Sequence, residues 1–153
     1  MNNIVYIFLI SMLPLVELRG AIPIGAALGV EYYYNFIAAI IGNLLPVPFI
    51  LLFIPKILEF LNRFKPFQPI VRWLWKKADK HSGRVLSGAF IGLMSFVLLP
   101  IPGTGAWTGS LIAALFKLPF WRSLLAVTLG VIGCGVIMCL ASYGVVGFLS
   151  FLN

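Results

Sequence analysis

Charged residues are scarce in this chain. Only 10% of its 153 residues are Asp, Glu, Lys or Arg, and only four are acidic, whereas 61% are hydrophobic and the mean hydropathy is +1.07. Too few polar side chains remain to coat a surface facing water, so lipid must be the solvent for most of the chain. The composition excludes an ordinary soluble domain and predicts an integral membrane protein.

Cysteine and histidine are rarer still, with two and one in the whole chain. Cys134 and Cys139 lie five apart in an apolar run and have no partners at metal-ligand spacing, which favours small core residues over a disulfide or a zinc site. The sequence also lacks a nucleophile–base pattern and a phosphate-binding Gly-Lys-Ser/Thr loop. We therefore expect a protein that is not an enzyme and that binds no metal or cofactor.

The positive charge is concentrated in the central segment 56–84, which contains eight of the eleven Lys and Arg residues and two of the four acids. A basic chain can indicate nucleic-acid binding, but bases flanked by apolar runs follow the positive-inside bias of membrane proteins. We therefore expect a cytoplasmic segment in a cell inner (plasma) membrane protein, with membrane lipids and no nucleic acid as partners. Apolar residues at helical spacing over 57–64, and aromatics among bases over 72–77, predict a basic interfacial helix.

Four apolar stretches make up most of the rest: residues 4–29, 33–54, 85–116 and 121–142. The second and fourth have about the 20 residues that a helix needs to cross a hydrocarbon core of about 30 Å. The first and third are longer and are broken by prolines and glycines, so each divides into two arms of about 10–14 residues that reach only part of the way across. Such arms predict re-entrant helical hairpins, whose turns are tolerated where protein or a wet cavity satisfies the backbone.

These patterns predict an all-α integral membrane fold, built as an inverted repeat of a re-entrant hairpin plus a transmembrane helix. The single membrane domain divides into 1–55, 56–84 and 85–153, with the interfacial helix in the middle part. The connector 117–122 contains two bases and is expected on the cytoplasmic side, whereas the connector 30–34 contains none. The alternative topology makes both long stretches kinked full spans and places the connector 117–122 outside.

Two charges lie within the first apolar stretch, at Glu17 and Arg19. A charged side chain at the centre of a membrane costs about 2.5–3.5 kcal/mol on insertion scales, and a functional site is the usual reason for it. Two residues apart, the pair would not face one another in a regular helix, but at a turn they could pair or share a polar cavity. Arg19 could then bind an anionic group while Glu17 couples protons or orients the site; the alternative is a structural pair that holds the turn.

The turns of the two hairpins are further candidates for binding. Free N–H groups at the start of each outgoing arm, near Gly20 and Gly105, would form the positive end of a helix dipole and could accept a phosphate or carboxylate. The same dipeptide, Gly-Ala, occurs at 20–21 and at 105–106, which is a weak sign of a sequence repeat between the halves. The residues that break the two stretches are Pro14, Gly20, Pro23 and Gly25 in the first and Pro100, Pro102, Gly103 and Gly105 in the second.

Several uncharged polar groups and one aromatic could also contribute. Asn43, Thr104 and Thr108 could hydrogen-bond a ligand, although repair of neighbouring backbone is the commoner role. Trp107 lies close to the second turn and could line a pocket. Arg122 follows the cytoplasmic connector and is either an interfacial anchor or a contact for a lipid headgroup phosphate.

Three motifs together point to a family: Glu17-Leu-Arg-Gly-Ala-Ile-Pro23, Gly42-Asn-Leu-Leu-Pro46 and Pro100-Ile-Pro-Gly-Thr-Gly-Ala-Trp-Thr-Gly109. The chain resembles the family of putative small multidrug export proteins over nearly its whole length. That family looks related to the DedA superfamily, which implies paired re-entrant hairpins and movement of polyprenyl phosphate or other phospholipids between leaflets. On that resemblance Glu17 and Arg19 are the acid and base of the first hairpin. The second turn has no acid, unlike the DedA pattern, which argues against a relay between two acids.

The sequence therefore predicts a small multipass transporter of an anionic lipid, such as a polyprenyl phosphate, or of a small amphipathic substrate, with proton coupling through Glu17. One half would rock against the other around the site. With so few helices per chain, a homodimer is plausible. The alternative function is a membrane scaffold or assembly factor whose polar turns only lock helices together.

Overall fold

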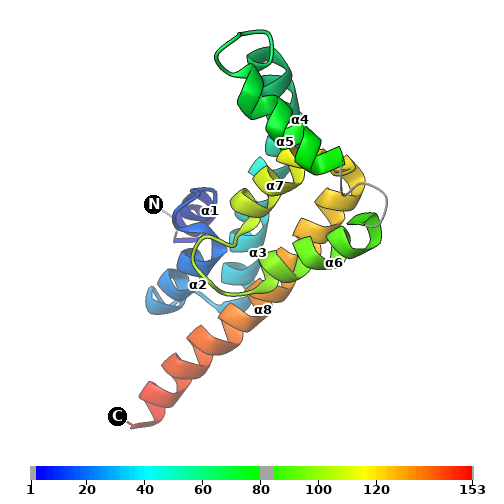
Figure 1. Cartoon of the computed structure of the whole chain (residues 1–153). Helices are drawn as coiled ribbons and strands as arrows, with labels where there is room; N and C mark the ends of the chain where they lie inside the picture. Colours follow the sequence, from blue (N-terminus) through cyan, green and yellow to red (C-terminus); the bar gives the residue numbers. More distant parts are fainter. Residues whose placement is uncertain (1–2, 80–84, 153) are drawn as a thin grey trace.

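The computed structural model describes residues 3–79 and 85–152, and within them the chain is all-helical, without a strand (Figure 1). This confirms the predicted all-α class. The helices are α1 (Asn3–Ser11), α2 (Glu17–Ala27), α3 (Tyr32–Leu44), α4 (Pro46–Leu61), α5 (Gln68–Asp79), α6 (Val85–Leu98), α7 (Ala106–Leu115) and α8 (Phe120–Leu152).

Two segments are long and apolar enough to cross a membrane by length and composition, as the sequence predicts. One is Tyr32–Leu61, in which α3 passes through a helical Leu45 directly into α4, and the other is Phe120–Val145 within α8. The first extends beyond the end expected from the sequence, so that the expected boundary after residue 55 falls inside α4. The reason is that Ile57, Leu58 and Leu61 prolong the apolar pattern of α4, because a first charged residue does not by itself end a helix.

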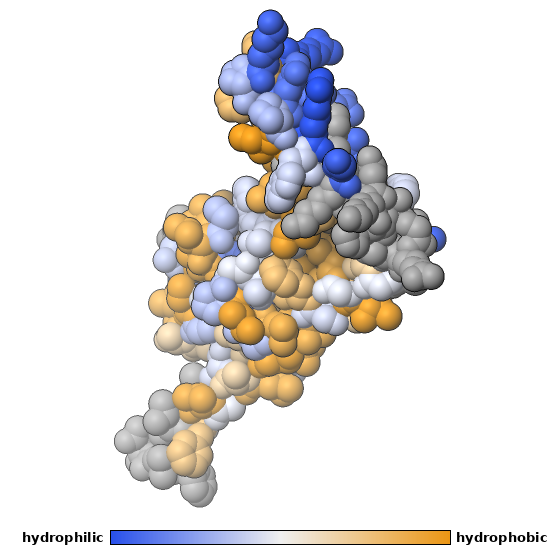
Figure 2. All heavy atoms as spheres, in the orientation of Figure 1, coloured by the Kyte–Doolittle hydropathy of each residue, from blue (hydrophilic) through white to orange (hydrophobic). Residues whose placement is uncertain are grey.

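The predicted interfacial helix is shorter than expected and begins later. Residues 57–61 belong to α4, and the separate basic helix is α5, which presents exposed Arg72 and Lys76 together with exposed Ile70 and Trp73. Figure 2 shows that the most hydrophilic residues gather at the end formed by α4 and α5, whereas many hydrophobic residues, with paler ones among them, cover the body of the molecule. Such extensive exposed apolar surface suits contact with lipid.

Each half contains two short helices joined by a turn. The turn between α6 and α7 spans residues 99–105, as the proline and glycine pattern predicts, and Gly103 there has a φ of 87°. The turn between α1 and α2 spans residues 12–16, earlier than predicted. The expectation that Gly20, Pro23 and Gly25 break this hairpin is therefore wrong, because all three lie inside α2.

The two glycines of α2 are explained by packing. A Cβ atom added at Gly25 would collide with the side chain of Asn35 on α3, and one added at Gly20 would lie 2.6 Å from Cγ1 of Val16. At Gly25 the missing side chain lets α2 and α3 approach closely, which is the usual function of glycine within membrane helices, whereas at Gly20 it makes room for the side chain four residues earlier in the chain. The sequence marks these positions correctly as special, but their role is close contact rather than chain reversal.

Helices of each half pack against helices of the other half as well as against their own. Helix α1 packs against α3, and α6 packs against α8, within their own halves. The second helix of each hairpin also crosses to the other half, so that α2 packs against α8 and α7 packs against α4. The turn between α6 and α7 is thereby brought against the first hairpin (Figure 1).

Matching backbone features in the two halves are 88 residues apart. Helices α2 and α7 end in the same turn, with left-handed residues Gly29 (φ 71°) and Lys117 (φ 52°). In this turn Val30 N–H donates to Gly25 O at 3.0 Å, and Leu118 N–H donates to Ala113 O at 2.9 Å, which is the Schellman pattern. Helices α3 and α8 then begin at Tyr32 and Phe120. The structural spacing between the halves is therefore 88 residues. It differs from the 85 residues that separate Gly20 from Gly105, the pair that the sequence suggests.

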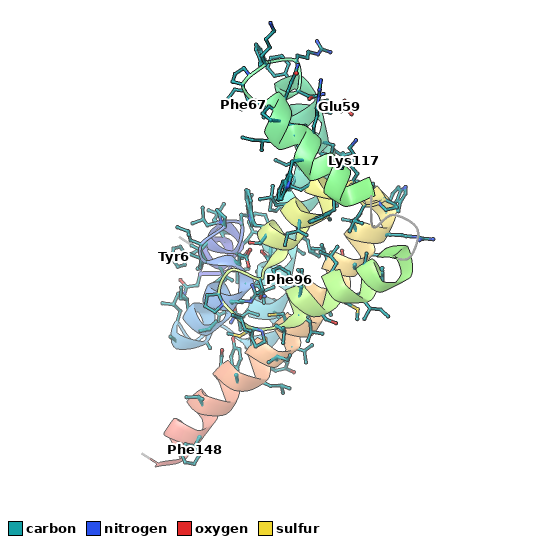
Figure 3. All side chains as sticks on the ribbon, viewed as in Figure 1. Tyr6, Glu59, Phe67, Phe96, Lys117 and Phe148 are labelled. Carbon is teal, nitrogen blue, oxygen red and sulfur yellow. The ribbon has the colours of Figure 1, made fainter. Side chains whose placement is uncertain are left out.

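The connector containing Lys117 lies toward the same end of the molecule as α5. Helix α7, which leads into this connector, contacts α5 as well as α4. Figure 3 labels Lys117 on the side of Glu59 and Phe67, with Phe148 near the far end of α8. The bases of the connector and the described bases of residues 56–76 are thus on one side of the apolar body.

Candidate functional site

The turn of the first hairpin places Glu17 and Arg19 against the turn of the second. Glu17 is the first residue of α2 and has a φ of 50°, a conformation that non-glycine residues seldom adopt. With the backbone in this conformation the two side chains can meet although they are two residues apart. Arg19 Nη1 lies 3.0 Å from Glu17 Oε2, and the two side chains retain only 12% and 8% of their exposure.

The guanidinium of Arg19 also binds the end of α6. Its Nη2 donates to the carbonyl oxygens of Val97 at 3.0 Å and Leu99 at 2.7 Å, and to Thr104 Oγ1 at 3.1 Å. The last carbonyls of a helix lack partners within the helix and form the negative end of its dipole. A cation supplied by the opposite hairpin therefore caps α6.

The carboxylate of Glu17 binds the start of α7 in a complementary way. Its Oε1 accepts a hydrogen bond from Trp107 N–H at 3.2 Å, one of the first N–H groups of α7. The residue that precedes α7 is Gly105, and a Cβ atom there would collide with the Glu17 carboxylate. An acid at a helix N-terminus is favourable, so Glu17 supplies the cap that Gly105 cannot supply itself.

Trp107 makes the converse contact, in which a side chain of the second hairpin binds the backbone of the first. Its ring Nε1–H donates to Met12 O at 3.0 Å, just beyond the end of α1. Thr104 holds its own turn, since its hydroxyl lies 3.0 Å from Leu99 O and 2.9 Å from Ile101 O. Each hairpin therefore satisfies backbone groups of the other, and we call Glu17, Arg19, Thr104, Gly105 and Trp107 the interhairpin cluster.

The expected anion-binding N–H groups are both occupied in this structure. Gly20 N–H donates to Val16 O at 2.9 Å inside α2, so the prediction of a free donor there is wrong. The N–H of Trp107, after Gly105, is bound by Glu17. The position predicted for an anionic ligand is therefore filled by the carboxylate of the protein itself.

The remaining predicted residues lie outside the cluster. Pro100, Pro102 and Gly103 are exposed and shape the second turn, whereas Pro23 lies in α2 and Thr108 in α7.

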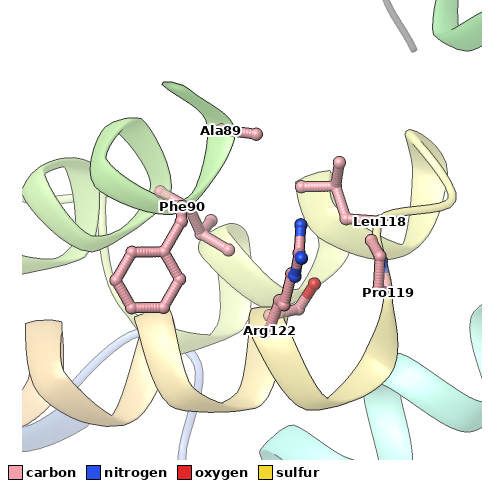
Figure 4. Close-up of a pocket in the computed structure, with 7 residues that line it drawn as sticks. Ala89, Phe90, Leu118, Pro119 and Arg122 are labelled. Atoms are coloured by element: carbon pink, nitrogen blue, oxygen red, sulfur yellow. The ribbon is translucent and has the colours of Figure 1, made fainter. Parts of the chain in front are cut away.

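Asn43 on α3 is fully buried, and neither polar atom of its side chain has a hydrogen-bond partner. Arg122 is exposed on the first turn of α8, beside a separate pocket between α6 and α8 (Figure 4).

Sequence reasoning missed some participants in the cluster. The carbonyls of Met12, Val97 and Leu99 are backbone groups that no side-chain pattern reveals. The sequence predicts Cys134 as a core residue, which its 1% exposure confirms, but Cys134 also lies close enough to Arg19 and Glu17 to interact with their charges. The 88-residue spacing aligns Arg19 with Trp107, but it is a property of the backbone turns and not of the residue types, so the sequence does not link the two turns.

Residues 17–137, well over half of the chain, match the family described as putative small multi-drug export protein. The chain belongs to this family. The match begins at Glu17 and continues through the second hairpin into α8, so it includes every residue of the interhairpin cluster. The export label of this small multi-drug export family and the two long apolar helices agree with a membrane location. No curated protein and no solved structure matches the chain.

Proposed function

We propose that the chain is a small multipass transporter in which two re-entrant hairpins enter the membrane from opposite faces and meet at the interhairpin cluster. The helices of the hairpins have 9, 11, 14 and 10 residues. At about 1.5 Å per residue each is too short to cross a hydrocarbon core of about 30 Å. The packing of each half's helices against the other half and the 88-residue spacing support an inverted repeat, the plan of many secondary transporters and one that a DedA relationship would also imply.

The proposed orientation follows from charge. The basic α4–α5 end and the connector with Lys117 lie on one side, and the positive-inside bias assigns that side to the cytoplasm. For a protein of the inner membrane, α5 would then lie on anionic headgroups of the cytoplasmic leaflet.

The observation that carries the function is the position of the Glu17 carboxylate. It rests between the Arg19 guanidinium and the N-terminus of α7, two groups that together would hold an anion of any source. Protonation of Glu17 removes its negative charge and so favours its replacement by an external anion. Proton binding and the binding of an anionic amphiphile, such as a polyprenyl-phosphate-like lipid, are thereby coupled.

The same replacement supplies a conformational step. Glu17 and Arg19 join α2 to the ends of α6 and α7, so releasing them frees one hairpin from the other. Transporters of inverted-repeat design alternate access by moving one half against the other around a central site. We therefore infer that the interhairpin cluster has two roles. It binds the substrate, and in the absence of substrate it holds the two hairpins together in the closed state of the transporter.

A scaffold function is the second candidate, and one observation favours it. Both terminal nitrogens of Arg19 already bind groups of the protein, and of its three nitrogens only the buried Nε has no partner, so most of the cluster is satisfied without any ligand. Flux and stability measured on the same variants separate the two functions.

The test uses the full chain in proteoliposomes with a fluorescent farnesyl phosphate as the anionic probe and ethidium as a cationic comparison. Glu17→Gln is expected to abolish proton-dependent movement of the farnesyl phosphate while the protein still inserts into the membrane. The control is Glu31→Gln, an exposed acid at the start of α3. If Glu17→Gln lowers the melting temperature but transports as well as the unmodified chain, the scaffold function replaces the transport proposal.

Cys134 offers a second readout for release of the two hairpins from each other. It is buried beside Arg19, whereas Cys139, five residues further along α8, is partly exposed. In a Cys139→Ser background, N-ethylmaleimide should label Cys134 faster in the Glu17→Gln variant than in the chain with Glu17. Equal labelling rates would contradict an opening step controlled by Glu17.

A further inference from the structure

A pocket separate from the interhairpin cluster lies between α6 and the start of α8 (Figure 4). Its walls are mainly apolar and come from α6 and from the connector before α8, while α8 contributes two polar residues. The lining residues are Ala89, Phe90, Leu93, Leu118, Pro119, Arg122 and Ser123.

Within the described part of the chain, the two polar side chains of this pocket have no hydrogen-bond or ion-pair partner. Figure 4 shows the side chain of Arg122 rising between Phe90 and Leu118, and no acid in the described part of the chain pairs with it. Ser123 is only 1% exposed, and its Oγ has no hydrogen-bond partner. A buried hydroxyl without a partner is uncommon in folded proteins, and unlike Asn43 this one lines a pocket that a ligand could enter.

The backbone at this position also favours an anion. Ser123 N–H donates to Pro119 O at 2.9 Å, so the amides of residues 120–122 precede this helical hydrogen bond of α8. Unpaired amides at the start of a helix attract negative charge, and α8 is 33 residues long. The helix start, the guanidinium and the buried hydroxyl therefore converge on one small region.

The corresponding place in the first half of the chain is filled by the protein. Asn35 stands 88 residues before Ser123, and its Nδ2 donates to Tyr143 OH at 2.8 Å; that hydroxyl in turn donates to Val30 O at 2.5 Å. Val30 likewise stands 88 residues before the pocket residue Leu118. The Tyr143 hydroxyl thus occupies, in the first half, the place that a ligand oxygen could occupy in the second.

We propose that this pocket binds the phosphate group of an anionic phospholipid of the surrounding leaflet. Arg122 and Ser123 would hold the phosphate oxygens, and the apolar walls would contact the start of the acyl chains. A lipid is favoured over free phosphate because Trp121 and Leu125, beside the pocket residues on α8, are 72% and 57% exposed on an apolar surface. The site is distinct from Glu17 and Arg19 and requires no transport step.

The test is native mass spectrometry of the purified full chain, released from micelles that contain phosphatidylglycerol or phosphatidylcholine. We expect phosphatidylglycerol to be retained preferentially, and Arg122→Ala to weaken its binding about tenfold, as loss of one charge-assisted hydrogen-bonding group predicts. Ala89→Phe fills the pocket without changing any charge and should have the same effect. The matched control is Arg63→Ala, an exposed base between α4 and α5.

Each other result overturns the proposal in a specific way. Equal losses in the Arg122 and Arg63 variants would mean diffuse attraction to anionic lipid, and unchanged binding in Ala89→Phe would mean that the pocket is not the site. Competition by inorganic phosphate at the concentration of the lipid would assign the site to a soluble anion. Elution volume and helix content, measured for every variant, show whether the fold is kept. Arg122→Lys keeps the positive charge and should bind the lipid more tightly than Arg122→Ala.

Discussion

Arg19 and Trp107 stand 88 residues apart, and each donates a hydrogen bond to a carbonyl at the end of the other half's first helix. Arg19 binds Val97 O and Leu99 O at the end of α6, and Trp107 binds Met12 O just past the end of α1. The donors differ in charge but act in the same way, because each satisfies a carbonyl that its own helix leaves without a partner. The reciprocity ties the two hairpins together at both turns.

Removing the ring N–H of Trp107 should weaken the contact between the two hairpins while an aromatic ring stays in place. Trp107→Phe leaves the Met12 carbonyl without its partner, and we expect it to destabilise the chain by about 1 kcal/mol, the usual net value of a hydrogen bond. The measurement is the thermal unfolding midpoint in detergent. Trp121→Phe is the control, because Trp121 is 72% exposed and should leave the midpoint unchanged.

Gly105 should be intolerant of a side chain only while Glu17 is present. In Gly105→Ala the new Cβ would collide with the Glu17 carboxylate and displace it from Trp107 N–H, at a cost of about 1–3 kcal/mol. The effect should largely disappear when the alanine is introduced into a Glu17→Ala chain. Gly144→Ala is the control, since nothing lies within 4 Å of a Cβ atom there. A loss that persists without Glu17 would mean that the strain arises elsewhere.

How much of this arrangement the sequence reveals depends on the kind of signal. The second turn follows from Pro100, Pro102 and Gly103, and the importance of Glu17 and Arg19 follows from charge in an apolar run, because both are local properties. The flux and stability measurements described above distinguish a transport role of these two charges from a structural one.

The first turn was misplaced because Pro and Gly also occur inside helices where packing requires them. Pro23 and Gly25 lie within α2, where Gly25 makes room for Asn35. The 88-residue spacing was hidden because the left-handed turn after α7 uses Lys117 where the turn after α2 uses Gly29. Backbone geometry is repeated there, but residue type is not.

The Glu17–Arg19 pair should show strong coupling in a double-variant cycle. Arg19→Ala leaves a mostly buried carboxylate without its cation and leaves the end of α6 uncapped, so we expect a loss of about 3 kcal/mol. Removing both side chains in a Glu17→Ala/Arg19→Ala chain should cost less than the sum of the single changes, because no unpaired charge is left behind. Unfolding midpoints of the four chains give the coupling. Additive losses would indicate that the two residues act independently.

The proposed topology makes Lys117 a cytoplasmic residue, because the connector that contains it lies toward the same end as α5. A single cysteine at position 117, in a chain whose Cys134 and Cys139 are replaced by serine, should react with a membrane-impermeant maleimide only after the cytoplasmic side is exposed. The residue is exposed but has a left-handed φ of 52°, so the variant must first be shown to insert. Arg63→Cys, at the α4–α5 end, provides the matched control and should label from the same side. Labelling of position 117 from outside, with position 63 labelled from inside, would replace the two hairpins with kinked helices that cross the membrane completely.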